Sequence, residues 1–207
     1  MRAKRVIIFA IAAFAASTSV LAAPEFAVPT REPFMRTGAV TSQPIGHHEF
    51  CQRNVDECAV KTVPRSRAQV TDAGWAAIRE VNTDVNQRIM PMTDAELFGR
   101  NEVWTYPSDT GDCEDYVLLK RRELIRRGFS EADLLITVVR KYDGTGHAVL
   151  TVRTSEGDFV LDNLSSEVRL WSDTPYHYLK RQSSMHSGRW VEIENCVEDV
   201  PVGSIDK

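Results

Sequence analysis

The spacing of apolar residues changes once along this chain, and that change limits the folds that it can adopt. Between Thr71 and Pro91, and again between Thr110 and Arg127, apolar residues recur every three or four positions, which predicts two helices. From Leu134 onward they recur every second position, which predicts strands. Helices followed by strands indicate an α+β fold in which a helix packs on an antiparallel β-sheet.

The predicted sheet is built from short segments rich in Val, Ile, Leu and Thr. Three of them, Leu134–Arg140, His147–Arg153 and Phe159–Asn163, are separated by glycine-containing turns, so we expect an antiparallel meander. A further strand is expected at Arg189–Ile193. Between the two long helices, residues 93–99 have the pattern of a short helix with a capping box and a terminal glycine.

The first 23 residues have the pattern of a secretory signal peptide. Three cationic residues precede an apolar run, and small residues follow up to Ala22 and Ala23, after either of which we expect cleavage. An uncleaved membrane anchor is the alternative, although the apolar run is short for a membrane span. The pattern predicts an exported protein, located in the periplasm or secreted from the cell.

Composition and charge exclude several classes of protein. With 43% hydrophobic and 26% charged residues, the chain has the make-up of an ordinary folded domain and not of a disordered or multispan membrane protein. Without residues 1–23 it keeps 22 basic and 29 acidic residues, a net charge of −7. The dense basic group at Lys120–Arg127 is expected on the solvated side of a helix, so we expect no nucleic-acid partner.

Residues 24–66 contain five of the nine prolines and show no sustained apolar periodicity. We therefore predict an irregular N-terminal arm, followed by one domain at residues 67–207. Both a lid over a functional cleft and a permanent part of the fold are compatible with this pattern.

Cys51 and Cys58 lie seven positions apart within this arm. In an exported chain such a pair is expected to form a disulfide that closes a small ring. A metal site that also uses His47 and His48 is the alternative, although the spacing matches no zinc pattern. Cys196 has no evident partner, so we expect it to be buried or paired with another cysteine.

Cys113 lies in the expected first turn of the helix that ends at Arg127. Free backbone N–H groups and the helix dipole at that position favour a thiolate, which is the nucleophilic form of cysteine. Three carboxylates in the same turn, Asp112, Glu114 and Asp115, oppose thiolate formation unless a cation neutralises them. Cys113 is therefore a candidate nucleophile.

The predicted hairpin brings His147 and Asp162 close together. If residues 154–157 form a four-residue loop, Val149 faces Asp162 and His147 lies two positions further along the same sheet face. We expect the helix of Cys113 to pack on that face, which would complete a set of nucleophile, base and orienting carboxylate. A small core cysteine, an exposed histidine and a turn aspartate are the alternative explanation of the same spacing.

Three motifs in this order resemble those of the bacterial transglutaminase-like cysteine proteinases, a family that includes LapG-like periplasmic proteases. They are Gly111–Tyr116, Gly146–Leu150 and Val160–Asn163, and the similarity extends from about Trp75 to Ser183. The resemblance implies a papain-like or transglutaminase-like core and export from the cytoplasm.

The resemblance also implies roles for individual residues. Cys113 would be the nucleophile, His147 the general base and acid, and Asp162 the residue that orients the histidine. The activity implied is that of a thiol protease, a hydrolase that cleaves a protein substrate through a thioester. The family further implies an envelope or adhesin protein as substrate and a regulatory partner at the inner membrane.

In LapG-type enzymes calcium binds beside the cysteine, and the matching positions here are Asp112, Glu114 and Asp115. Carboxylate oxygens suit calcium, and a bound cation would relieve the crowding of negative charge around Cys113. Helix N-terminal carboxylates favoured by the dipole are the alternative, and Asp115 could instead bind backbone. No cofactor is expected to be required for the chemistry itself.

Two further functions use the same residues or the same fold. Acyl transfer from glutamine to an amine needs the same triad and differs only in what reaches the thioester. A binding module would keep the fold without turnover, but it has no physical need for Cys113, His147 and Asp162 together. For the oxyanion, the backbone N–H of Cys113 is the expected donor, and the indole of Trp104 is a weaker candidate because an aromatic residue there more often serves packing.

Overall fold

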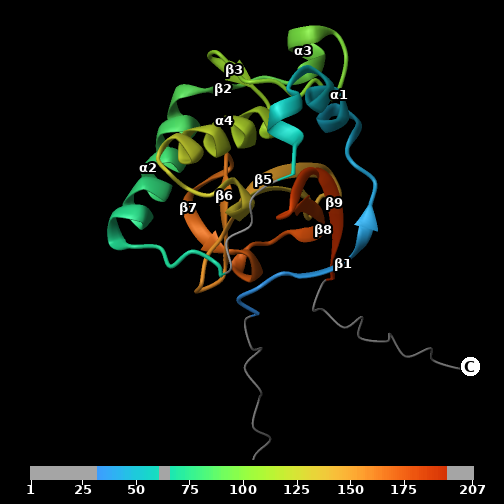
Figure 1. The fold of residues 1–207 in the computed structure, drawn as a ribbon. Coiled ribbons are helices and arrows are strands. Elements are labelled where there is room, and N and C mark those ends of the chain that lie inside the picture. The colour runs from blue at the N-terminus through green and yellow to red at the C-terminus, as the bar shows by residue number, and fades with distance from the viewer. Residues whose placement is uncertain (1–31, 61–65, 195–207) are drawn as a thin grey trace, which may run out of the picture. The chain divides into compact units, whose positions relative to one another are not determined.

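Helices cover one face of a seven-stranded antiparallel sheet in the computed structural model, which describes residues 32–60 and 66–194 (Figure 1). The strand order is β1-β9-β8-β4-β5-β6-β7. The strands are β1 (Arg36–Thr41), β4 (Leu134–Arg140), β5 (Gly146–Arg153), β6 (Asp158–Asp162), β7 (Ser165–Leu170), β8 (His177–Ser183) and β9 (His186–Glu194). The predicted signal peptide and Cys196 lie outside the described residues.

The helices on this face include the three that the sequence predicts. They are α1 (Ile45–Arg53), α2 (Asp72–Arg88), α3 (Asp94–Phe98) and α4 (Cys113–Arg126). The described residues also form short 3-10 helices at η1 (Val55–Cys58), η2 (Glu131–Asp133) and η3 (Trp171–Asp173). Thr71 caps α2, and Thr93 forms with Glu96 the expected capping box of α3. No helix within the described parts of the chain is long and apolar enough to cross a membrane.

The helix that carries Cys113 begins three residues later than expected. Thr110 and Gly111 form strand β3 (Thr110–Gly111), which pairs in parallel with β2 (Met90–Pro91). Asp112 is then the N-cap, so Cys113 is the first residue of α4. The two-residue pairing fixes the entry of the chain into the helix and therefore the place of the cysteine.

The prediction of an irregular arm at residues 24–66 is wrong for most of the part of this segment that the structure describes. Residues 36–41 form edge strand β1, which pairs with β9, and residues 45–53 form helix α1. The segment therefore belongs to the sheet and to the helical layer, and the domain does not begin at residue 67. The edge position explains why β1 is hard to recognise, because most of its residues are exposed and show no buried alternation.

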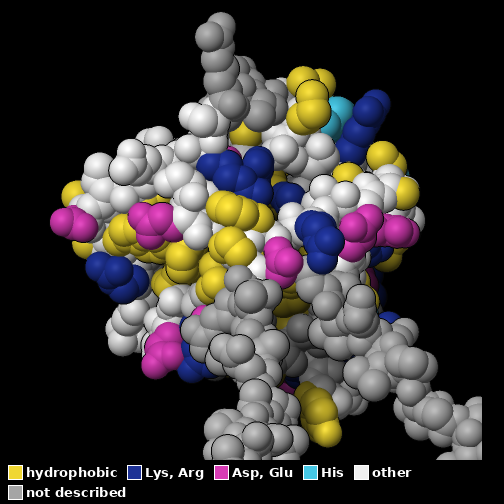
Figure 2. Space-filling view, turned by 90° about the horizontal axis from the view of Figure 1, so that it is seen from below, with side chains coloured by type: hydrophobic (Ala, Val, Ile, Leu, Met, Phe, Trp, Pro, Cys, Tyr) yellow, Lys and Arg dark blue, Asp and Glu magenta, His cyan; other side chains and the backbone are white. Residues whose placement is uncertain are grey.

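Buried side chains form two clusters, one on each face of the sheet. The first lies under the helices and joins Leu118 and Leu124 of α4 to Leu150, Val152 and other apolar residues of the sheet. The second lies on the face without helices and is made of Met35, Val139, Val149, Val160, Trp171, Tyr178 and Ile193. Figure 2 views the molecule from that side, where apolar side chains lie beside Lys and Arg side chains.

The position of α4 corrects one expectation. We expected the helix on the face that carries His147, but it packs on the face of Ala148, Leu150 and Val152. His147 is two positions from Val149 in β5 and therefore shares the face of the second cluster. Both faces of the sheet carry an apolar cluster, so the alternation of apolar residues does not determine which face a helix covers.

Candidate active site

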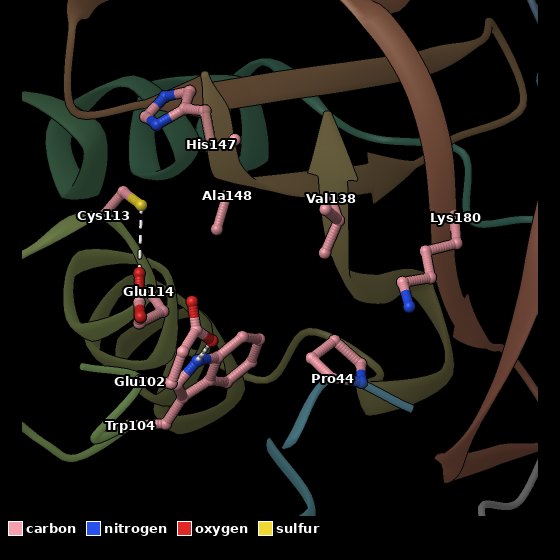
Figure 3. Close-up of a pocket in the computed structure, with 10 residues that line it drawn as sticks. Pro44, Glu102, Trp104, Cys113, Glu114, Val138, His147, Ala148 and Lys180 are labelled. Atoms are coloured by element: carbon pink, nitrogen blue, oxygen red, sulfur yellow. Dashed lines mark hydrogen bonds between the residues drawn. The ribbon is translucent and has the colours of Figure 1, made fainter. Parts of the chain in front are cut away.

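A pocket of about 410 Å³ lies where α4 begins, beside the start of β5 (Figure 3). Both Cys113 and His147 line it, although α4 and His147 belong to opposite faces of the sheet. The lining residues are Pro44, Glu102, Trp104, Cys113, Glu114, Val138, Gly146, His147, Ala148 and Lys180.

His147 and Asp162 form a hydrogen-bonded pair. Nε2 of His147 lies 2.8 Å from Oδ1 of Asp162, and both side chains are buried. The pairing of Arg153 with Asp158 and of Leu150 with Leu161 is the register that the four-residue loop predicts. Because Asp162 contacts Nε2, the ring nitrogen Nδ1 is the one left to act on a nucleophile.

Further donors hold the Asp162 carboxylate. The hydroxyl of Tyr176 donates to Oδ2, and the backbone N–H of Leu164 donates to Oδ1 at 3.0 Å. Burial opposes ionisation, but the hydrogen bonds from His147, Tyr176 and Leu164 outweigh it and hold the pKa of Asp162 below its usual value. Asp162 is therefore a carboxylate across the neutral pH range. The ring of Tyr176 also packs 5.6 Å from that of His147.

The thiol of Cys113 donates a hydrogen bond to Oε2 of Glu114 at 3.0 Å (Figure 3). Burial raises the pKa of Cys113 well above its ordinary value, and the carboxylate of Glu114 adds to the effect. The backbone N–H of Ala148 acts in the opposite direction. Burial, reinforced by Glu114, thus keeps Cys113 a thiol at neutral pH.

Three carboxylates form a group that could hold a cation. One ligand oxygen each of Asp94, Asp112 and Glu114 lies within 4.8 Å of the others. Burial, together with the charges of its neighbours, raises the pKa of Asp112 to about 6 and that of Glu114 to about 8. Oδ1 of Asp94 and Oδ1 of Asp112 are buried and have no hydrogen-bond partner in the described residues. Such hard oxygen donors suit calcium.

Asp115, which the resemblance offered as a calcium ligand, is not in this group. Its Oδ1 accepts a hydrogen bond from the backbone N–H of Thr105 at 2.8 Å, so it holds the loop before α4 in place. Asp94 takes its position in the group and comes from the first turn of α3. In the sequence Asp94 follows the N-cap Thr93, where an acidic residue is already explained by the helix dipole.

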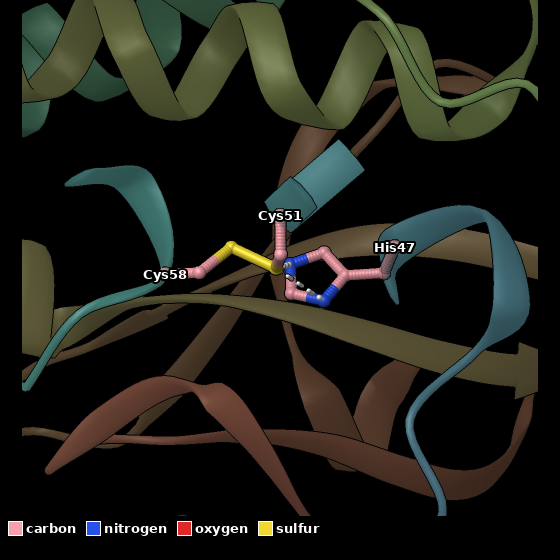
Figure 4. A group of neighbouring side chains, drawn as sticks. All are labelled: His47, Cys51 and Cys58. Atoms are coloured by element: carbon pink, nitrogen blue, oxygen red, sulfur yellow. Dashed lines mark hydrogen bonds between the residues drawn. A yellow bond between two sulfur atoms is a disulfide. The ribbon is translucent and has the colours of Figure 1, made fainter. Parts of the chain in front are cut away.

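The second candidate metal group, in the N-terminal segment, contains a disulfide. Cys51 and Cys58 are bonded to each other, as expected (Figure 4). Burial lowers the pKa of His47 to about 3, and Arg121 and His48 lower it further. His47 is therefore a neutral core residue, which accepts a hydrogen bond from the indole of Trp190 at 3.2 Å. The metal alternative for these cysteines is thereby excluded in this structure.

The indole of Trp104 is directed to a carboxylate. Its Nε1 donates to Oε2 of Glu102 at 3.2 Å, and its ring packs edge-on against His47 and Trp190. Trp104 is almost fully buried and forms a wall of the pocket. Its packing role was the favoured expectation, and the contact with Glu102 competes with any role as an oxyanion donor.

The sequence profile of the bacterial transglutaminase-like cysteine proteinases (BTLCP) matches residues 37–198. The chain belongs to this family. It is therefore a cysteine peptidase, of the hydrolase class. A comparison with curated proteins found none that is similar.

Solved structures of LapG from Legionella pneumophila are similar to the chain. Calcium-bound LapG is 20% identical with a TM-score of 0.50, and the match covers 76% of this chain and 87% of that chain. Another LapG structure is 23% identical with a TM-score of 0.48, covering 72% and 81%. EGTA-treated LapG is 23% identical with a TM-score of 0.46, covering 68% and 75%. The likeness to calcium-bound LapG confirms the mixed fold of helices on an antiparallel sheet.

Proposed function

We propose that the chain is an exported cysteine endopeptidase in which Cys113, His147 and Asp162 form the catalytic triad. The observation that carries the proposal is the hydrogen bond of 2.8 Å between His147 and Asp162, because His147 also lines the pocket that contains Cys113. A nucleophile, a base and a carboxylate that orients the base are the parts that covalent peptide cleavage needs.

The reaction proceeds in two halves. Nδ1 of His147 takes the proton from Sγ of Cys113, and the sulfur attacks the peptide carbonyl carbon. The C–N bond breaks as the imidazolium returns the proton to the leaving amine, which gives a thioester on Cys113. Water then attacks the thioester while the imidazole accepts its proton, and the acid product leaves as the thiol is regenerated.

The protein supplies two kinds of stabilisation to these steps. Asp162 keeps His147 in the tautomer with the proton on Nε2 and stabilises the imidazolium that forms. The backbone N–H of Cys113, at the first position of α4, is a free helix N-terminal donor that can bind the oxyanion. Both groups are fixed by the strand and helix that carry them.

We further propose that Asp94, Asp112 and Glu114 bind a calcium ion. One LapG structure in the comparison is calcium-bound. Here burial, together with neighbouring carboxylates, raises the pKa of Asp112 and of Glu114, so the ionised forms of both groups lack a compensating positive charge beside the thiol. A bound cation would supply positive charge that offsets these carboxylates and favours the thiolate of Cys113. Its loss is expected to slow catalysis and not to unfold the protein.

The proposed substrate is a protein of the cell envelope, such as an adhesin. The N-terminal pattern of residues 1–23 and the Cys51–Cys58 disulfide both support export to an oxidising compartment. An inner-membrane regulatory partner stays a prediction from the family resemblance.

The test compares the chain with its Cys113→Ala variant, each incubated with envelope proteins of the source cell in calcium or in EGTA. Mass spectrometry of new N-termini is the readout, and we expect new termini only with the unchanged chain and fewer of them in EGTA. The same termini with both proteins would overturn the triad. Incorporation of a labelled amine at glutamine without new termini would instead establish acyl transfer.

A further inference from the structure

A buried lysine lies two helical turns behind the candidate nucleophile. Lys120 is seven residues after Cys113 on α4 and is fully buried, so the expectation that the basic group at Lys120–Arg127 lies on the solvated side of the helix is wrong for this residue. Its Nζ donates to Oδ1 of Asn82 on α2 at 2.8 Å. Burial lowers the pKa of Lys120 to about 7, and the negative charge of Asp162 acts against that lowering. A buried cation is costly unless an opposite charge or hydrogen bonds compensate it, so this position calls for an explanation.

Asn82 and Asn86, one helical turn apart on α2, both bind the backbone around the turn after Asp162, and Asn82 is the one that contacts Lys120. Nδ2 of Asn82 donates to the backbone oxygens of Ser165 and Ser166, at 3.0 and 3.2 Å. Nδ2 of Asn86 donates to the backbone oxygen of Asp162 at 2.8 Å and to that of Ser165 at 3.1 Å. Both asparagines therefore fix the backbone between β6 and β7, next to Asp162, whose carboxylate binds His147.

We propose that Lys120, acting through Asn82 and through its charge, is a positioning residue that holds Asp162 in place and ionised behind His147. The inference rests on the proposed triad. An ammonium group can only donate hydrogen bonds, so Lys120 forces the oxygen of the Asn82 amide to face it. The amide nitrogen must then face the turn, where both acceptors are carbonyl oxygens. Without Lys120 the side-chain amide of Asn82 is free to rotate. Its oxygen Oδ1 would then face the backbone oxygens of Ser165 and Ser166, to which it cannot donate a hydrogen bond.

The charge of Lys120 adds a second effect. A nearby cation favours the ionised form of a carboxyl group. Removing it is expected to raise the pKa of Asp162, so that the carboxylate takes up a proton at higher pH and loses its hold on His147. Packing alone predicts no such dependence on pH, which makes the pH profile the distinguishing readout.

The experiment measures alkylation of Cys113 by iodoacetamide between pH 4 and 9, in calcium, by mass spectrometry of the peptide that carries this residue. For Lys120→Met, which keeps the length of the side chain without its charge, we expect a roughly fivefold slower reaction at pH 7. We also expect the acid limb of the profile to move up by about half a pH unit. Lys120→Arg, which keeps a cation, should restore the position of that limb.

Arg181→Met is the matched control, because Arg181 is also a buried cation but lies near Asp158 and not Asp162. Its profile should equal that of the unchanged chain. A Lys120→Met protein that is folded by circular dichroism and has the unchanged rate and profile would overturn the proposal. If that variant does not fold, Asn82→Ser, which removes the amide between Lys120 and the turn, replaces it, and an unchanged alkylation rate there overturns the proposal equally.

Asp162→Asn separates this inference from the proposed function. Alkylation needs no peptide substrate, so it reports the state of the thiol alone. If Asp162→Asn alters the profile and Lys120→Met does not, the triad stands and only the role of Lys120 fails. If neither variant alters it, the proposed triad fails as well.

Discussion

Asp162 and Glu114 are two carboxyl groups of nearly equal burial, 4% and 6% exposed, yet their environments act on them in opposite ways. Asp162 receives hydrogen bonds from His147, Tyr176 and Leu164, and its pKa lies below the usual value. Glu114 lies beside Asp112 and accepts from the thiol of Cys113, and its pKa rises to about 8. Burial alone therefore does not decide the charge of a carboxyl group; the supply of donors and of neighbouring charges does.

The comparison separates two tasks in one pocket. A carboxylate already supplied with donors can orient a base, whereas a group of carboxyls short of donors is ready to accept a cation. Asp162 therefore serves the proposed triad without a bound cation, because hydrogen bonds already stabilise its charge. It also explains how the proposed calcium site can act on Cys113 through the adjacent Glu114.

Replacing the well-supplied carboxylate should give the largest effect. In Asp162→Asn the amide can donate to His147 and hold the wrong tautomer, so kcat/KM for the identified envelope substrate should fall by about 100-fold or more. The steady-state rate measures this, with Glu167→Gln as a control at an exposed carboxylate. A loss no greater than that of the control would show that Asp162 does not orient the base.

The donor-poor carboxyls should make stability depend on pH. The pKa values of Asp112, Glu114 and Asp115 are raised to about 6, 8 and 7, so the folded state binds more protons than the unfolded state from about pH 4 to 8. In EGTA the stability is therefore highest at the acid end of this window and falls as the pH rises through it. Thermal unfolding should show Tm falling by several degrees between pH 5 and 8, and less in calcium. A Tm that rises over this range in EGTA would contradict the raised pKa values.

Glu114→Gln tests whether the carboxyl group beside Cys113 controls the reactivity of the thiol. Above pH 8 Glu114 is ionised, so removing its negative charge lowers the pKa of Cys113, and alkylation by iodoacetamide at pH 9 in EGTA should become about three to ten times faster. The response of this rate to calcium should also shrink. Glu167→Gln, at an exposed carboxylate outside this pocket, serves as control. Equal rates for the unchanged chain and Glu114→Gln would show that Glu114 does not restrain the thiol.

Tyr176→Phe should give the smallest effect, because it removes one of the donors to Asp162 and leaves those of His147 and Leu164. The pKa of Asp162 should rise slightly, and kcat/KM should fall about two- to fivefold with little change in KM. Steady-state kinetics on either side of neutral pH measure it, with the larger loss on the acid side. A loss as large as that of Asp162→Asn would mean that Tyr176 acts directly on the substrate.

The sequence predicts those elements whose apolar period is strong. Helix α2, strand β4 and the β5–β6 register follow from spacing, because a one-residue slip would turn buried side chains to the wrong face. Strands β1 and β7 are edge strands with exposed residues, and β8 buries the polar Arg181 and Gln182, so none of the three shows the expected alternation.

The site could be predicted only as far as its parts lie in recognisable local contexts. Cys113 stands at a helix start, and His147 and Asp162 stand in a hairpin whose loop length sets their neighbourhood. Asp94 enters the acidic group from another helix, which no local spacing can reveal. The sequence also could not predict which face of the sheet α4 covers. The alternation of apolar residues shows which residues share a face, but not which face a helix packs against.

The most direct test of the central claim is to trap the acyl-enzyme. The chain is mixed with the envelope substrate identified by its new N-termini, quenched in acid within a turnover and digested for mass spectrometry. The account predicts a substrate-derived acyl group on the peptide that carries Cys113, removable by hydroxylamine as a thioester is, and absent from Cys113→Ala. Cleavage that proceeds without this adduct, or an acyl group on another residue, would contradict the account.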